Sequence, residues 1–322
     1  MKKYYIGIDI GGTYTKVGVL TKAFDIIGKA SLPTSSYKSP QRLISAVSRA
    51  AGLLLKSRNI TKTAVYGVGV GIAGLVDAEK GVIKNLINIP GYRGFNIKRA
   101  FEKEFGLSVC ADNDANAMAL AEFHKGAGRG GTNIVCVTLG TGVGGGIIIG
   151  GRLYRGSTSS AGELGHIPIN MKGQRCNCGG TACIETYAGN NYIAGRLKGA
   201  LKRRIGRPGM AARTLAADAA PKLLYEAAKD GDRSALELWE EIGAEIGVML
   251  AGVINLLDPD RVVIGGGIAD AGRFLFSPIK KTVRSRAMKS KRRIKIVKAR
   301  LGKDAGLVGA AMLARLERTK WL

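Results

Sequence analysis

Short apolar runs alternate with an amphipathic segment in the first third of the chain. The runs YYIGIDI, KVGVL and VYGVGVGI are rich in β-branched residues and glycine, and they predict buried strands. Between the second and the third run, residues 40–59 carry apolar side chains at helical spacing, among them Leu43, Val47 and Leu54. Strands that alternate with helices predict an α/β fold, with a doubly wound sheet as its architecture.

The same pattern recurs further along the chain. Residues 5–20 and 134–149 both have the order strand, glycine-rich turn, strand, which indicates two related halves facing a cleft. Residues 185–257 are mainly helical in pattern, and residues 234–257 predict one long amphipathic helix. Residues 262–269 return to a strand and a glycine loop, and residues 301–322 predict a closing helix. The apolar faces of the helices after residue 185 predict a contact surface for a homodimer or homotetramer.

Composition fits an ordinary globular protein with an unusual charge. The chain has 322 residues, 46% of them hydrophobic, which is enough for two domains with separate cores. Its formal net charge is +26, and residues 280–300 hold 11 basic residues and no acidic one. Such a tract favours a polyanionic partner, but a solvated helix face followed by an edge strand over residues 293–299 is the simpler interpretation.

The start of the chain and its longest uncharged run predict a cytoplasmic protein. The segment MKKYYIGID reaches Asp9 before an apolar signal region can develop. Residues 133–151 are uncharged, but seven of them are glycine, so two strands around a loop are expected there instead of a membrane span.

Three glycine-rich loops are candidates for phosphate binding. Glycine leaves backbone amides open to an anion, and a neighbouring hydroxyl or lysine adds donors. Each loop taken alone is better interpreted as a tight hairpin, and none has the spacing of a Walker A motif. The aspartate in the first loop is suited to hold a hydrated Mg²⁺, and together the three loops favour a nucleotide. The phosphate-binding candidates are Asp9, Gly11, Gly12, Thr13, Lys16, Gly140, Thr141, Gly142, Gly265, Gly266 and Gly267.

Three of the five cysteines are gathered in the segment GHIPINMKGQRCNCGGTACIET, residues 165–186. An odd number of cysteines in a reducing compartment is better explained by a metal than by disulfides. His166, Cys176, Cys178 and Cys183 form a ligand set that tetrahedral Zn²⁺ prefers, and four protein ligands indicate a structural site. The alternative is a reduced cluster without metal. Cys110 and Cys136 lie apart in apolar surroundings and are expected to be inert core residues.

These segments together resemble the ROK family of sugar kinases and repressors, which belongs to the actin-like ATPase superfamily. The similar motifs are DIGGTYTKVGV, NDAN at residues 113–116, TLGTGVGGGI, GELGH at 162–166, CNCGGTACIE at 176–185 and VVIGGGIA. They occur in the family's order from Ile6 to about Ala314. One departure is Ala182, which stands where the family's CxCGxxGC motif commonly has glycine.

The resemblance implies an α/β fold of two actin-like (ribonuclease H-like) domains flanking a cleft, with a helical dimerisation region in the larger one. Residues 1–112, completed by the C-terminal helix at about 301–322, would form the small domain. Residues 113–300, with the zinc loop and the helical region, would form the large one.

The resemblance also implies roles for individual residues. Asp114 would be the general base, which fits phosphoryl transfer because one carboxylate can accept the proton of the attacking hydroxyl. From the residues alone, the better interpretation of Asn113 or Asp114 is the N-cap of the following helix, and a residue at a helix start can have both roles. In the family's pattern Asn113, Glu163, His166 and Glu185 would bind the sugar, with His166 also holding the metal. His124, at the end of a helix, is expected to have no chemical role.

Three classes of function follow from this resemblance. The first is an ATP-dependent hexose kinase that uses Mg²⁺, with glucose as the commonest substrate of this motif set and N-acetylglucosamine, N-acetylmannosamine, fructose or mannose as alternatives. The second is a ROK repressor, which would carry a helix-turn-helix domain before the first glycine loop, where this sequence has five residues ahead of Ile6. The third is a sugar-binding protein without catalysis, which Asp9 and Asp114 argue against. Inorganic polyphosphate, bound along Lys280–Arg300, is a further hypothesis for the phosphate donor.

Overall fold

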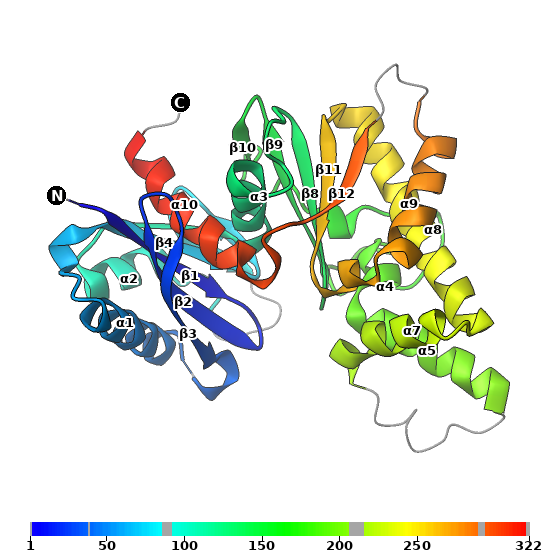
Figure 1. The fold of residues 1–322 in the computed structure, drawn as a ribbon, viewed down its shortest axis with the longest axis horizontal. Coiled ribbons are helices and arrows are strands. Elements are labelled where there is room, and N and C mark those ends of the chain that lie inside the picture. Colours follow the sequence, from blue (N-terminus) through cyan, green and yellow to red (C-terminus); the bar gives the residue numbers. More distant parts are fainter. Residues whose placement is uncertain (1, 38, 86–91, 206–215, 289–293, 320–322) are drawn as a thin grey trace. The chain divides into compact units, whose positions relative to one another are not determined.

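The fold is described from a computed structural model that covers residues 2–37, 39–85, 92–205, 216–288 and 294–319 (Figure 1). The chain divides into two compact units. The first contains Met1–Gly130, Gly146–Gly162 and Leu301–Leu322, and the second contains Gly131–Gly145 and Glu163–Arg300. Helix 114–125 belongs to the first unit, because it packs against the C-terminal helix. The predicted domain boundaries, at residue 112 and at about residue 300, stay a prediction.

The first unit is built on a five-stranded sheet of mixed direction, in the order β3-β2-β1-β4-β7. The central strand pairs antiparallel with its hairpin partner and parallel with β4. Two short strands form a separate ribbon. The strands are β1 (Tyr4–Ile10), β2 (Tyr14–Thr21), β3 (Ile26–Pro33), β4 (Val65–Ile72), β5 (Leu75–Asp77), β6 (Val82–Asn85) and β7 (Val109–Asn113).

Helices cover both faces of this sheet (Figure 1). Apolar side chains of the first two helices join one core with the strands, including Leu43, Val47 and Phe101, which are fully buried. On the other face the C-terminal helix lies directly on the sheet, and a Cβ on Gly69 in β4 would overlap the Ala310 carbonyl. The helices are α1 (Pro40–Ser57), α2 (Ile97–Phe105), α3 (Asp114–Lys125) and α10 (Ala305–Thr319).

The second five-stranded sheet has the order β10-β9-β8-β11-β12. Its first strand in sequence is central, the next two lie successively on one side, and the last two lie on the other, as in the first sheet. The internal repeat predicted from residues 5–20 and 134–149 is therefore confirmed in the strand order, and β12 is the predicted edge strand. The strands are β8 (Ile134–Leu139), β9 (Val143–Ile149), β10 (Arg152–Tyr154), β11 (Arg261–Gly265) and β12 (Lys295–Lys298).

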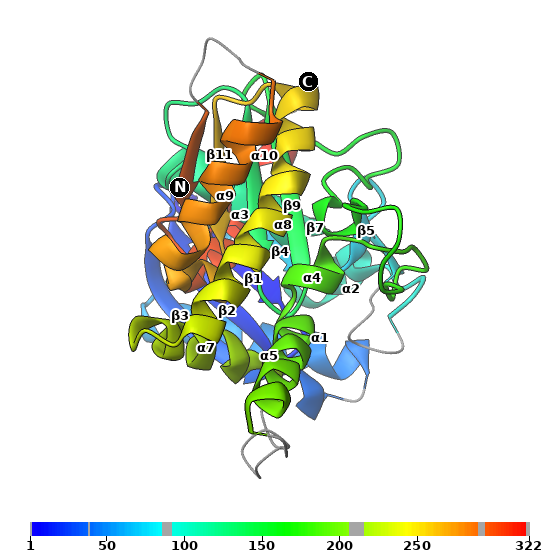
Figure 2. The same ribbon diagram turned by 90° about the vertical axis from the view of Figure 1, so that its right-hand side faces the viewer.

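In the second unit α8 (Arg233–Leu257) lies side by side with α9 (Arg273–Arg286), as Figure 2 shows. The apolar face of α8, including Trp239, Ile242 and Leu250, is buried in the core of this unit. That face is thus covered within the chain, while Leu256 at its end is 82% exposed. The other helices are α4 (Glu185–Ala188), α5 (Asn190–Ile205) and α7 (Ala220–Lys229).

The structure bears on two other predictions, the membrane span and the basic tract. The described residues contain no helix that is long and apolar enough to cross a membrane. The basic tract at 280–300 divides between the exposed side of α9 and the strand β12, and residues 289–293 lie outside the described residues. The helix-and-edge-strand interpretation of the tract is confirmed for its described parts.

Candidate functional site

The first glycine loop is a tight hairpin between β1 and β2. The Gly11 amide donates to the Tyr14 carbonyl at 3.0 Å, and Gly12 and Thr13 are exposed at the tip. A hairpin does not exclude phosphate binding, because the tip amides remain open to solvent.

Asp9 and Lys16 lie on neighbouring strands beside this hairpin. Lys16 Nζ is 3.5 Å from Asp9 Oδ2 and donates to the Lys303 carbonyl at 2.7 Å. Burial raises the pKa of Asp9, and the Lys16 ammonium opposes that rise. A carboxylate whose ionised form is disfavoured by burial gains from a bound cation, which fits the expectation of a Mg²⁺ ligand.

Asn113 and Asp114 lie where β7 ends and α3 begins. Asn113 is the N-cap, and its side-chain oxygen accepts from the amides of Ala115 at 2.8 Å and Asn116 at 3.3 Å. Its side-chain nitrogen donates to the Gly74 carbonyl at 3.0 Å. The capping interpretation of Asn113 is confirmed. Asp114 is the first helical residue and is only partly buried, so a rigid backbone presents its carboxylate.

The other two glycine loops belong to the second unit. The 140–142 loop closes with a bond from the Gly140 amide to the Gly142 carbonyl at 3.0 Å. Gly266 follows β11 with φ +87°, and a Cβ there would overlap the Leu139 carbonyl, so only glycine fits. Gly266 and Gly267 are exposed.

Glu163 and His166 lie around a single 3₁₀ turn, Leu164–His166. His166 Nε2 is 3.8 Å from Glu163 Oε2. Burial and the charge of Glu185 raise the pKa of Glu163, while His166 opposes the rise. Two carboxylates and an imidazole therefore share one neighbourhood in this unit.

Glu185 makes a contact that sequence reasoning missed. Its Oε2 accepts from the Val143 amide at 3.0 Å, directly after the second glycine loop. A few residues on, the Asn190 amide donates to the Gly140 carbonyl at 2.9 Å. The start of α4 and α5 therefore fixes this loop. A main-chain partner leaves no signal in a sequence, so only the structure could reveal it.

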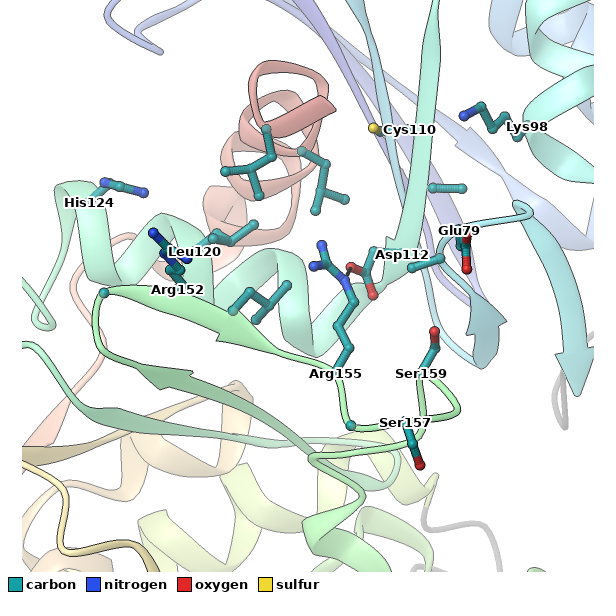
Figure 3. Close-up of a pocket in the computed structure, with 17 residues that line it drawn as sticks. Glu79, Lys98, Cys110, Asp112, Leu120, His124, Arg152, Arg155, Ser157 and Ser159 are labelled. Atoms are coloured by element: carbon teal, nitrogen blue, oxygen red, sulfur yellow. Dashed lines mark hydrogen bonds and ion pairs between the residues drawn. The ribbon is translucent and has the colours of Figure 1, made fainter. Parts of the chain in front are cut away.

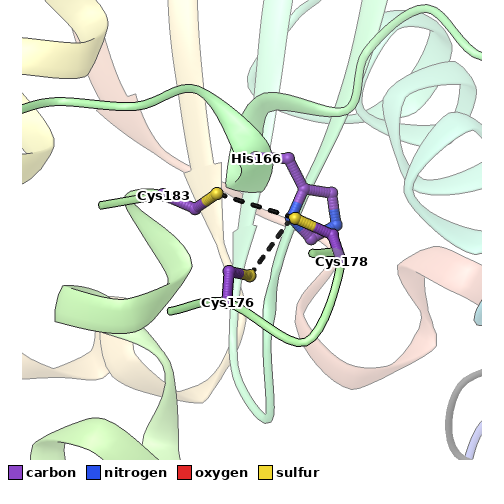
Figure 4. A group of neighbouring side chains, drawn as sticks. All are labelled: His166, Cys176, Cys178 and Cys183. Atoms are coloured by element: carbon purple, nitrogen blue, oxygen red, sulfur yellow. Dashed lines mark hydrogen bonds between the residues drawn. The ribbon is translucent and has the colours of Figure 1, made fainter. Parts of the chain in front are cut away.

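The predicted metal ligands converge on one point (Figure 4). The ligand atoms of His166, Cys176, Cys178 and Cys183 all lie within 4.8 Å of one another. Cys178 Sγ is 3.7 Å from Cys183 Sγ, and Cys176 Sγ is 3.7 Å from His166 Nδ1. In a tetrahedral site with Zn–S bonds of about 2.3 Å, neighbouring sulfurs lie about 3.8 Å apart. The donor set and its spacing therefore fit Zn²⁺.

The thiols of this cluster differ in acidity. Burial raises the pKa of Cys183 to about 12 and also raises the pKa of Cys176. A hydrogen bond from the Gly180 amide lowers the pKa of Cys178. A cation is therefore needed to hold all three as thiolates at neutral pH.

Ala182 shows why the family commonly has glycine there. Its φ is +57°, in the left-handed region that is strained for a residue with a side chain, and it is fully buried. The Ala182 amide nevertheless donates to the Gln174 carbonyl at 2.9 Å, and the loop keeps its ligand geometry.

A cavity of about 530 Å³ within the first unit lies behind the end of β7 (Figure 3). Asp112 and Arg155 lie on its wall, with Arg155 Nε 2.7 Å from Asp112 Oδ2. His124 also lines it, and burial lowers the pKa of that histidine. Cys136 is buried as predicted, whereas Cys110 is only partly buried and lines this cavity. The prediction of a core position for Cys110 was wrong, because the cavity opens beside β7.

The predicted site residues thus divide between the units. The first unit holds Asp9, the hairpin, Lys16 and the pair Asn113–Asp114. The second holds the other two glycine loops, Glu163, Glu185 and the metal cluster.

Comparisons with known proteins assign this chain. The ROK family model matches residues 5–317. A glucokinase of Halalkalibacterium halodurans is 36% identical, over 97% of this chain and 95% of the relative. The crystal structure of a ROK family glucokinase from Streptomyces griseus in complex with glucose and AMPPNP is 34% identical, with a TM-score of 0.81 over 97% of this chain and 99% of that one. The Escherichia coli transcriptional regulator NagC is 30% identical, over 91% of this chain and 71% of NagC.

The chain belongs to the ROK family. The expected fold class, mixed α/β with two sheets of the actin-like type, is confirmed. Its similarity to glucokinases covers nearly the full length of the chain. The chain is therefore an ATP-dependent hexokinase, a sugar kinase of this family.

Proposed function

We propose that this protein is a glucokinase that transfers the γ-phosphate of ATP to the 6-hydroxyl of glucose. The observation that carries the proposal is the pair Asn113–Asp114 at the start of α3, on a chain similar to glucokinases from end to end. A capped helix start holds the Asp114 carboxylate at a fixed position, as general-base chemistry requires.

In this proposal Asp114 accepts the proton of the sugar hydroxyl as its oxygen attacks the γ-phosphorus. The carboxylates of Glu163 and Glu185 accept hydrogen bonds from the other sugar hydroxyls. The imidazole of His166 and the second amide hydrogen of Asn113, whose oxygen already caps α3, also bind the sugar. Fixing the acceptor in this way converts a bimolecular encounter into a reaction between aligned groups.

The three glycine loops and Lys16 bind ATP in the proposed mechanism. Their amides and the ammonium neutralise phosphate charge as it redistributes toward the leaving oxygen. Asp9 would hold the Mg²⁺ that accompanies ATP, which supplies positive charge to the phosphates. Glu185 serves twice, since its contact with the Val143 amide also fixes the second glycine loop.

The cluster of His166 and three cysteines would bind one structural Zn²⁺. The ion would order the segment between Glu163 and Glu185, whose composition predicts little regular structure. Four protein ligands fill the tetrahedron, so Zn²⁺ would act on the shape of the sugar site and not as a Lewis acid.

Two alternatives have specific support. The basic, exposed face of α9, with Lys280, Lys281 and Arg284, favours polyphosphate as a second donor. A rate with polyphosphate equal to that of a blank without donor would exclude it. Similarity to NagC keeps sugar-responsive repression as the other candidate, and tight glucose binding without phosphorylation would favour it. A homodimer is also proposed, through surfaces other than the buried face of α8.

The test of the proposed base is Asp114→Asn. We expect the variant to fold and to bind glucose, with kcat lower by about 10²- to 10⁴-fold, the range expected for loss of a general base. Coupled assays of kcat and calorimetric glucose titrations measure both properties. An active Asp114→Asn enzyme would restrict Asp114 to a structural role at the helix start.

A further inference from the structure

Asp112 lies directly before the proposed catalytic pair and is 2% exposed. A buried carboxylate is costly unless it is hydrogen-bonded and paired with a positive charge. Asp112 has both kinds of partner, and they come from two different places in the first unit: the start of α3 and the segment after β10.

One oxygen of Asp112 holds the start of α3. Asp112 Oδ1 accepts from the Asn113 amide at 2.7 Å and from Asn116 Nδ2 at 2.9 Å. The Asn116 side-chain oxygen is buried without a hydrogen-bond partner among the described residues. The side chain of Asn116 is therefore turned so that its nitrogen donates to Asp112. Its oxygen is then left without a donor, which costs free energy.

The other oxygen of Asp112 holds Arg155. This residue follows β10 and reaches the end of β7 from the wall of the cavity, as Figure 3 shows. The Arg155 side chain is 32% exposed and lines the cavity. In a variant with a shorter side chain, water can therefore fill the vacated space without collapse of a packed core.

We propose that Asp112 and Arg155 are positioning residues for phosphoryl transfer, and that their ion pair fixes the position of the Asn113–Asp114 backbone. The proposal rests on the proposed function, because it takes Asp114 as the base. Two hydrogen bonds hold Asn113 in place. Its side-chain nitrogen donates to the Gly74 carbonyl, and its main-chain amide donates to Asp112 Oδ1. Only the Asp112 partner of this ion pair is buried, and in this proposal the pair's role is to hold one arrangement of the Asn113–Asp114 backbone, which is what a catalytic carboxylate needs.

The test compares Arg155→Gln with Arg152→Gln. Arg152 lines the same cavity three positions earlier and makes no ion pair in the described part of the chain, so it is the matched control. Arg155→Gln leaves Asp112 buried without its cation and lets the carboxylate turn. We expect kcat to fall about 10- to 100-fold, since a shift of about 1 Å at the base costs that much. The KM for glucose should change less than about threefold, while Arg152→Gln matches the wild type.

Further variants separate positioning from stability. Arg155→Lys keeps the charge but not the guanidinium geometry, and we expect an intermediate kcat. Asp112→Asn combined with Arg155→Gln should lower kcat no more than the worse single variant, because the two residues act as one unit. All rates are measured at a temperature where circular dichroism shows each variant to be folded.

Equal kcat values for Arg155→Gln and Arg152→Gln would overturn the proposal, as would additive losses in the double variant. Failure of the proposed function has a different signature, because Asp114→Asn would then keep activity or the wild type would not phosphorylate glucose.

Discussion

Asp9 shows the conflict between stability and function at a single residue. Its pKa is raised by burial, so folding favours the protonated carboxyl. Stability from this group is then greatest below the unfolded pKa of about 4 and is lost as pH rises through the folded value. Above that range, burial of Asp9 therefore lowers the stability of the fold.

The raised pKa of Asp9 leads to a prediction for Asp9→Asn. Without nucleotide, the variant should have a higher Tm than the wild type at pH 7, and the difference should vanish below about pH 4, where wild-type Asp9 is protonated. Its kcat should fall by about 10²-fold or more, as for loss of one preorganised electrostatic contact. Thermal scans across pH together with kinetics check both parts. A variant less stable than the wild type at pH 7 would show that the contact with Lys16 outweighs burial.

The thiol ligands make a second prediction at this scale. Cys178→Ser replaces a thiolate by a hydroxyl that stays protonated at neutral pH, and we expect it to release the metal. The wild type should contain about one zinc per chain and lose it as pH falls, because the buried Cys176 and Cys183 have raised pKa values and protons compete for the ligands.

The consequence of zinc loss distinguishes the roles of the metal. We expect Cys178→Ser to raise the KM for glucose and to lower kcat, because Glu163 and Glu185 lose their common anchor. We also expect a higher KM for ATP in this variant, because Glu185 contacts the Val143 amide directly after the second glycine loop. Fully active wild-type protein with less than about 0.1 zinc per chain by metal analysis would refute the structural-zinc account.

At the scale of elements, close helix packing depends on glycine in the central strands. Gly69 in β4 faces the backbone of α10, where the Ala310 carbonyl leaves no space for a methyl group. A main-chain atom cannot move aside as the end of a flexible side chain can. The C-terminal helix therefore lies against the sheet only while this position has no side chain.

Gly69→Ala should therefore destabilise the protein by about 1–3 kcal/mol or more, the cost of overpacking. The matched control is Gly52→Ala on the exposed side of α1, where nothing lies within 4 Å of the new methyl. That variant should gain about 0.5–1 kcal/mol, because alanine is the better helix former. Denaturant unfolding of both variants measures the difference. Equal effects would show that α10 does not lie on β4 as described.

At the scale of the whole molecule, the sequence predicted the features that depend on local patterns of residues. Apolar periodicity located α1 and α8 within one or two residues, and the repeated strand–turn–strand pattern anticipated the common order of both sheets. The spacing of Cys176, Cys178 and Cys183 found the metal cluster, because few other reasons gather such residues. The site roles of Asp114, Glu163 and Glu185 came from family resemblance and remain predictions.

What the sequence could not predict depends on contacts between distant segments. Arg155 and Asp112 are separated by 43 positions and neither belongs to a motif. The bond of Glu185 to the Val143 amide involves a main-chain group that nearly every residue has. Cys110 alternates with apolar residues in a strand, and only the packing around it shows the cavity beside it.

The central claim is that the molecule phosphorylates glucose with ATP, and one measurement tests it most directly. Purified protein is assayed with ATP and Mg²⁺ against glucose, N-acetylglucosamine, N-acetylmannosamine, fructose and mannose, and the product of the fastest reaction is identified by nuclear magnetic resonance. We predict the highest kcat/KM for glucose and a product that carries phosphate on the 6-hydroxyl. A higher kcat/KM for another sugar would contradict the assignment as a glucokinase, and no phosphorylation of any of the five would contradict the account as a whole.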